Sequence, residues 1–203
     1  MKKHLYKPHP WHGVSPGKDC PDLITAYIEI VPGDTVKYEI DKESGYLKVD
    51  RPQKFSNSVP ALYGFIPQTY CGTEIAKYAA LKSGKEVLKG DGDPLDICVL
   101  TEKNINNGDI LLEAIPIGGF RMIDKGEADD KIIAVLKQDE IYGHYKDITD
   151  CPEAIIARLK HYFLTYKNLP GSVQPVEIAN IYGSTEAKEV IRKSILDYNS
   201  TFE

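Results

Sequence analysis

One run of acidic residues has the types and spacing that chemistry requires. Three carboxylates, Asp91, Asp93 and Asp96, fall within the six residues 91–96, and an apolar segment follows them. Alternate side chains of an extended segment share a face, so Asp91 and Asp93 project the same way. Pro94 disfavours helix at Asp93 and marks a turn or strand edge. The apolar residues 97–100 then indicate a buried strand.

Carboxylates held together at the rim of a core must take up protons or bind cations. Residues 91–96 contain no Cys or His that could offer a softer ligand. The nearest Cys is Cys98, inside the apolar segment. Hard oxygen ligands favour Mg²⁺, Mn²⁺ or Ca²⁺ over zinc. The run therefore predicts a site for hard divalent cations.

Three other interpretations compete with this one. An Asp-rich loop is often a solvated turn, although apolar neighbours argue against that here. An EF-hand loop would place Glu102 at its twelfth position, but it needs Gly at the sixth, where Asp96 stands, and Leu95 replaces an oxygen ligand. In a phosphoaspartyl phosphatase the Asp-x-Asp follows a buried strand, whereas here the strand follows the acids.

Composition points to one globular domain covering residues 1–203. The chain has 42% hydrophobic residues and a formal net charge of −5, which suits a packed core and disfavours binding to nucleic acid. Local Lys and Arg clusters can still attract anions. The four cysteines form no Cys-x-x-Cys pair, and the N-terminus has no apolar leader. We therefore expect a reduced, cytoplasmic protein without a membrane segment.

Strands dominate the first two thirds of the expected fold and helices the last third. In chain order we expect an N-terminal arm (1–24), strands at 26–30, 36–40, 47–51 and 59–66, a long inserted connection (67–90) with a helix near 74–81, strands at 97–100, 110–116, 120–123 and 132–136, and a helical tail (152–203). Gly118 and Gly119 separate two of these strands and suit a bulge or barrel corner. This pattern predicts an α+β fold, mainly β, in which a small barrel carries packed helices.

The arm contains one misleading motif. Residues 13–17 fit the Gly-x-Ser-x-Gly pattern of a nucleophile elbow around Ser15. That elbow needs a strand before it and a helix after it, and Pro and His residues surround it here. We therefore expect no catalytic role for Ser15.

A second acid cluster, at 124–131, lies near the first in the expected sheet, and four basic residues are spread around both: Lys37, Arg51, Lys131 and Lys167. Acids that collect cations, together with basic side chains, can neutralise a polyanion. Two metals can activate water and stabilise a leaving oxygen while the basic groups bind phosphate. The combination predicts metal-assisted phosphoryl transfer.

The sequence also resembles family I soluble inorganic pyrophosphatases. Residues 91–97 resemble the signature of that family, and the resemblance extends from about Tyr27 to Lys167. It includes the segments 28–30, 37–45, 50–51, 63–66, 122–124 and 166–167, together with Asp129 and Lys131. The ordered set is far more specific than a single Asp-x-Asp.

This resemblance implies a five-stranded OB-like barrel flanked by two to three helices, and Mg²⁺-dependent hydrolysis of pyrophosphate to two phosphates. It implies three to four Mg²⁺ per active site with substrate, with Mn²⁺ as a possible substitute. Asp91, Asp96 and Asp129 should hold the first metal, and Asp96 should bridge to the second. Asp124 should join Asp129 at a further metal. The outer site should be lined by Glu29 and Glu39.

The resemblance makes Asp93 the general base, which takes a proton from a water between two metals. It implies six phosphate-binding residues: Lys37, Arg51, Tyr63, Lys131, Tyr166 and Lys167. Arginine suits a bidentate phosphate contact and lysine a point-charge contact. The expected partners are pyrophosphate and phosphate, with no nucleic acid or membrane, and a second copy of the chain in a dimer or hexamer.

Some features depart from the family pattern. Val59 stands where many relatives carry tyrosine, Lys125 stands where some bacterial members have an acid, and the connection between 65 and 90 is longer than in the shortest members.

The alternative function is a non-catalytic OB-type module that binds oligonucleotides. It would need stacking aromatics on a basic sheet face, which the clustered carboxylates disfavour.

Overall fold

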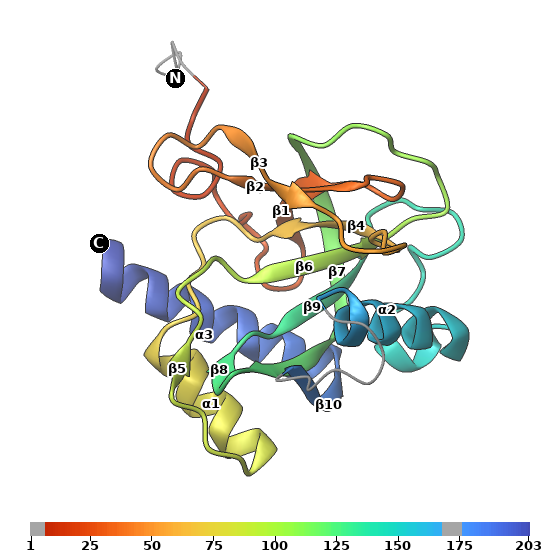
Figure 1. The fold of residues 1–203 in the computed structure, drawn as a ribbon. Coiled ribbons are helices and arrows are strands. Elements are labelled where there is room, and N and C mark those ends of the chain that lie inside the picture. Colours follow the sequence, from red (N-terminus) through yellow and green to blue (C-terminus); the bar gives the residue numbers. More distant parts are fainter. Residues whose placement is uncertain (1–6, 168–175) are drawn as a thin grey trace.

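Five strands form a closed ring at the centre of the structure, a computed structural model that describes residues 7–167 and 176–203. They are β1 (Ile24–Ile30), β4 (Leu62–Phe65), β6 (Asp96–Leu100), β9 (Lys131–Leu136) and β7 (Ile110–Asp124). Each pairs with the next, and β7 returns to β1. Only the β6–β9 pair of this ring is parallel. The described residues are mainly β with three α-helices, as the sequence predicted, and the strands form an OB-like ring (Figure 1).

Strand β7 is one continuous strand where the sequence predicted two. Its pairing with β9 shifts register between Pro116 and Gly118, so the glycines mark an irregularity within the strand. A Cβ on Gly118 would lie 2.4 Å from the Tyr182 carbonyl oxygen. Glycine therefore permits a close backbone approach here without ending the strand.

The C-terminal part is not wholly helical, which corrects the expected helical tail. Strand β10 (Val176–Gly183) lies between two helices and pairs antiparallel with β7. Its β-branched residues and Tyr182 favour a strand, and β7 extends far enough to offer it an edge. Helical patterns before and after residues 176–183 led to that expectation, and no strand pattern was recognised between them. Two short strands, β5 (Lys89–Gly90) and β8 (Glu127–Ala128), complete this sheet.

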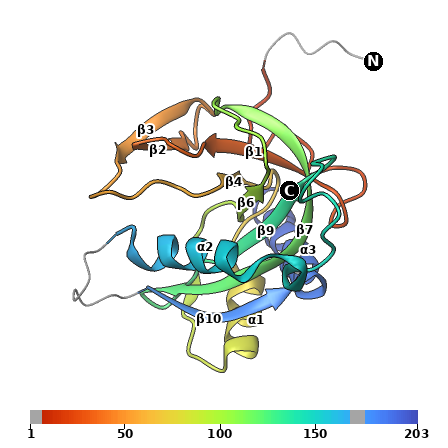
Figure 2. The same cartoon turned by 90° about the vertical axis from the view of Figure 1, so that its right-hand side faces the viewer.

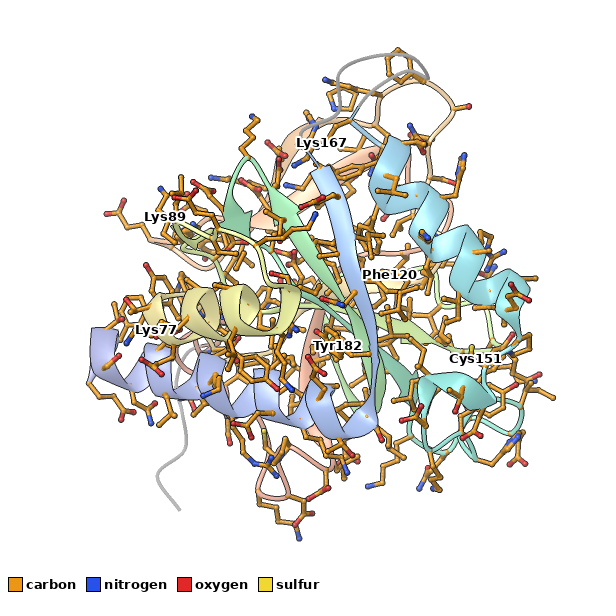
Figure 3. The ribbon with its side chains drawn as sticks, turned by 90° about the horizontal axis from the view of Figure 1, so that it is seen from below. Lys77, Lys89, Phe120, Cys151, Lys167 and Tyr182 are labelled. Carbon is orange, nitrogen blue, oxygen red and sulfur yellow. The ribbon has the colours of Figure 1, made fainter. Side chains whose placement is uncertain are left out.

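The three helices cover the ring from two directions. Helix α2 (Glu153–Thr165) buries Leu159 and Phe163 against one core cluster. Helices α1 (Thr73–Ser83) and α3 (Ser184–Phe202) lie side by side on another face (Figure 3). No helix in the described ranges is long and apolar enough to cross a membrane.

The N-terminal arm, which the sequence left without regular structure, is well packed, and the predicted hairpin stands apart from the ring. In the expected arm, whose first six residues lie outside the described ranges, Trp11 is only 3% exposed. The hairpin of β2 (Val36–Ile40) and β3 (Leu47–Pro52) forms a separate two-stranded sheet beside the ring (Figure 2).

Candidate active site

A cavity of about 270 Å³ lies where the β2–β3 hairpin, the loop of residues 91–95 (the acid loop) and helix α2 meet the ring. Its lining includes eleven of the thirteen residues that the sequence singled out: Lys37, Arg51, Tyr63, Asp91, Asp93, Asp96, Asp124, Asp129, Lys131, Tyr166 and Lys167. The other two, Glu29 and Glu39, line an adjoining cavity of about 170 Å³ that shares Asp93 and Asp96 with the first. The structure thus brings all thirteen predicted residues together.

Strand pairing places the central acids and the central lysine. Asp96 opens β6 and is the register partner of Lys131, which opens β9. The Lys131 side chain is 3% exposed, and its ammonium contacts both Asp96 and Asp129. The Tyr63 hydroxyl donates to Asp96 Oδ2 at 2.6 Å. One buried cation thus lies between two carboxylates from different segments of the chain.

Burial disfavours the charged forms of two carboxyl groups near this lysine. Desolvation and the nearby Asp129 carboxylate raise the pKa of Asp91 to about 9, and burial also raises the pKa of Asp129. Burial opposes the charge on Lys131, yet Asp129 and Asp96 together raise its pKa well above the ordinary value. The cluster therefore favours additional positive charge.

The adjoining cavity contains another acid whose charged form is disfavoured by burial. Burial raises the pKa of Glu29 to about 8, although the Ile40 backbone N–H donates to its Oε1 at 2.7 Å. Glu39 is paired with Lys37, whose ammonium lies 3.0 Å from it. The adjoining cavity is therefore also lined by more acidic than basic side chains.

The donor set fits hard divalent cations. Among the described residues no three His, Cys, Asp or Glu side chains are placed to hold one ion as they stand, and the Lys131 ammonium contacts both Asp96 and Asp129. Yet Asp91 and Asp129 are carboxyl groups with raised pKa values, and the buried Oδ1 of Asp124 has no hydrogen-bond partner in the described structure. Oxygen donors with uncompensated charge are what Mg²⁺ and Mn²⁺ require.

Basic side chains converge on the same cavity from the hairpin and from α2. Lys37 contacts Asp50 at 2.9 Å, and Arg51 contacts the same carboxylate. At the end of α2, Lys167 Nζ lies 2.6 Å from Asp124 Oδ2. These cations can exchange acid partners for phosphate oxygens.

The candidate base differs from the other acids in its surroundings. The side chain of Asp93 is 49% exposed, and it pairs with Lys42 of the β2–β3 turn. Its own backbone N–H donates to Asp91 Oδ1 at 3.0 Å, which links the two acids of the loop.

Sequence reasoning missed Glu127, which lines the first cavity, and Lys42, which lines the adjoining one. It also missed Asp50, which contacts Lys37 and Arg51. Lys42 and Asp50 lie in segments that carried the resemblance, and only the hairpin geometry shows their contacts. The two single residues that depart from the family pattern, Val59 and Lys125, lie outside the lining of both cavities. Val59 is buried in the core, and Lys125 is exposed in a turn at φ 53°.

An OB-like ring with carboxylates facing basic groups across one cavity defines a class of protein that handles phosphate with divalent cations. Comparison with known proteins narrows this class. Residues 26–199 match the family described as Inorganic pyrophosphatase. The inorganic pyrophosphatase of Chlamydia muridarum is 55% identical over 199 residues, which cover 96% of this chain and 95% of that protein.

More distant relatives agree. Soluble inorganic pyrophosphatase 2 of Chlamydomonas reinhardtii is 37% identical over 96% of this chain and 90% of its own length. The crystal structure of the Thermus thermophilus inorganic pyrophosphatase superposes with a TM-score of 0.78 at 29% identity, covering 95% and 99% of the two chains. The chain belongs to the family I soluble inorganic pyrophosphatases. These relatives do not favour the oligonucleotide-binding alternative.

Proposed function

We propose that this protein hydrolyses inorganic pyrophosphate to two orthophosphates and requires Mg²⁺ to do so. The observation that carries the proposal is the cavity in which buried carboxylates face Lys37, Arg51 and Lys167. The carboxylates can bind the cations that accompany pyrophosphate, and the basic groups can bind its oxygens. Family membership supports the same reaction.

In this proposal the carboxylates divide the metal ligation among them. Asp91, Asp96 and Asp129 would hold one cation, Asp96 would also contribute to a second, and Asp124 would hold a cation that arrives with substrate. Three to four Mg²⁺ per site would be bound with substrate, and Mn²⁺ could substitute. Bound Mg²⁺ supplies Lewis acidity that makes a nearby water easier to deprotonate.

The remaining residues bind substrate and move the proton. Asp93 accepts a proton from the attacking water at its carboxylate, and its partial exposure leaves it accessible. Lys37, Arg51, Tyr63 and the α2 pair of Tyr166 and Lys167 bind the phosphates. Lys131 leaves its acid partners for a phosphate oxygen once cations replace its charge.

We also propose that residues 1–203 form one domain that acts in the cytoplasm as a homo-oligomer. The arm, the inserted connection and the tail pack on the ring rather than apart from it. Light scattering of the purified chain tests the oligomer, and a mass equal to one subunit would contradict it.

Phosphate release from pyrophosphate tests the function. Release should need Mg²⁺, stop with EDTA, and return when Mg²⁺ is restored. Release that continues unchanged in EDTA would contradict the role given to the acids. Mg²⁺-independent binding of a fluorescent oligonucleotide, without any phosphate release, would favour the alternative instead.

A further inference from the structure

The backbone segment 69–72 lies directly against the acid loop. The Cys71 N–H donates to the Asp93 carbonyl oxygen at 2.9 Å, and the Gly92 N–H donates to the Cys71 carbonyl oxygen at 3.1 Å. A Cβ on Gly90 would lie 2.0 Å from that same Cys71 oxygen, so the two backbones are in contact. The position of the acid loop therefore depends on where Cys71 is held.

A carboxylate from the far end of the chain holds this segment. Asp197 of α3 accepts hydrogen bonds from the backbone N–H groups of Gly72 (3.0 Å), Glu74 (2.8 Å) and Ile75 (3.0 Å). Asp197 is 3% exposed. These three donors form the first turn of α1, which has no side-chain cap from its own N-cap residue. A buried anion at a helix N-terminus that accepts three hydrogen bonds is a strong anchor.

Neighbouring contacts tie α3 to the same segment. The Tyr70 N–H donates to the Ser194 carbonyl oxygen at 2.9 Å. Thr69 continues the link, because its Oγ1 accepts from the Leu95 N–H at 2.9 Å inside the acid loop. Figure 3, a view from below, shows α1 and α3 running alongside each other, with Lys77 marking α1. A continuous path of hydrogen bonds therefore runs from α3 to the acids.

We propose that Asp197 is a positioning residue for the metal-binding acids of the pyrophosphatase site. This inference rests on the proposed function, because it assumes that the acid loop holds divalent cations. Asp197 lines neither cavity of the active site. It acts through Cys71 and Gly72, whose placement fixes the backbone of Asp91 and Asp93 against the mutual repulsion of their carboxylates. Small displacements of such groups cost much of the affinity and rate.

The test compares Asp197→Asn with Glu189→Gln. The Asn side chain keeps the volume of Asp197 but cannot accept all three hydrogen bonds. Glu189 lies on the same helix, and its contacts are with Arg192 and Lys193 at the surface, so its variant controls for the loss of one charge. Mg²⁺ binding is measured by calorimetry below the melting temperature of every variant, beside amide hydrogen exchange and kcat.

Asp197→Asn should weaken Mg²⁺ binding by about 10-fold or more, as substitutions behind metal ligands do. Exchange should accelerate at the amides of Cys71 and Gly92, and kcat should fall even at saturating Mg²⁺. Glu189→Gln should match the wild type in all three. A folded Asp197→Asn protein that melts lower but binds Mg²⁺ as the wild type does would overturn the proposal, because a purely structural role predicts that result.

The wild-type chain offers a second measurement that needs no variant. Coupling between two sites is reciprocal, so Mg²⁺ should slow exchange at the Gly72, Glu74 and Ile75 amides as well as in the acid loop. Unchanged exchange at those three amides would also overturn the proposal. If the wild type binds Mg²⁺ but releases no phosphate from pyrophosphate, the proposed function fails while the binding comparison still decides the role of Asp197.

Discussion

At the scale of single residues, burial makes it unfavourable for neighbouring acids of the site to be charged at the same time. Asp91 has a pKa near 9 in the folded chain against an ordinary 3.8. A carboxyl with a raised folded pKa keeps its proton where the unfolded chain has lost it, so stability declines as pH rises between those two values. Metal ions that replace the proton remove this penalty and should stabilise the fold.

Asp91→Asn should therefore stabilise the metal-free protein. At pH 8 in EDTA we expect Tm to rise by about 2–4 °C for each ~1 kcal/mol of repulsion removed, the ratio for a chain of this size. The stabilisation by Mg²⁺ seen in the wild type should largely disappear. Thermal melts with EDTA and with Mg²⁺ at pH 5 and 8 measure both effects. Asp22→Asn, at an exposed carboxylate, is the control, and an Asp91→Asn protein less stable in EDTA at pH 8 would refute this charge argument.

Asp93→Asn should separate binding from turnover. The amide cannot accept the proton, so kcat should fall by at least about 100-fold, while Mg²⁺ and pyrophosphate should still bind because Asp93 is not among the proposed ligands. Steady-state kinetics and calorimetry check the two halves. Full activity would remove Asp93 from its proposed role as base.

At the scale of elements, the ring depends on very close backbone contacts between its strands. Gly64 of β4 is the register partner of Ile28 in β1, and a Cβ there would lie 1.9 Å from the Tyr27 carbonyl oxygen. The neighbouring residue, Tyr63, contacts Asp96 in the site. Backbone packing at this pair thus positions a proposed substrate-binding side chain.

Gly64→Ala should destabilise the fold by about 3 kcal/mol, because the methyl group meets backbone that cannot move aside as a side chain can. Gly33→Ala is the matched control. Gly33 has φ +99° but nothing within 4 Å of the added Cβ, so it should show backbone strain alone, about 1 kcal/mol. Urea denaturation measures both. Equal losses for the two variants would mean that the close contact with Tyr27 has no effect.

The sequence predicted the site better than it predicted the elements around it. The site acids and lysines sit in short motifs whose residue types already limit their chemistry. Strand alternation likewise indicated β1, β2 and β3. Closure of the ring, the β10 pairing and the Lys42 contact depend on segments distant in sequence, and no local pattern records them. Asp197 is an extreme case, because its partners lie more than 120 residues earlier.

At the scale of the whole molecule, the arm residues Trp11 and His12 and helix α3 meet at the segment behind the acid loop. The Trp11 indole donates to the Thr69 carbonyl oxygen at 2.7 Å, and His12 Nδ1 lies 2.7 Å from the Tyr198 hydroxyl of α3. Arm, insertion and tail therefore share one contact region (Figure 1). We expect these parts to unfold together with the ring.

Trp11 is the only tryptophan in the sequence, so its fluorescence reports this region alone. Its thermal transition should coincide with the loss of far-UV circular dichroism, because coincident probes mark a single cooperative unit. As a control, adding Mg²⁺ should shift the temperatures of both transitions by the same amount. An earlier fluorescence transition would show that the arm separates before the ring unfolds, and would contradict the single-domain proposal.

The most direct test of the central claim compares Mg²⁺-dependent phosphate release by the wild type and by Asp96→Asn. Asp96 lies between Tyr63 and Lys131 and is proposed to ligate two cations. Rapid release by the wild type that needs Mg²⁺ and falls by at least about 100-fold in the variant is the result predicted here. Release by a folded Asp96→Asn protein at the wild-type rate, or none from folded wild type with Mg²⁺, would contradict it.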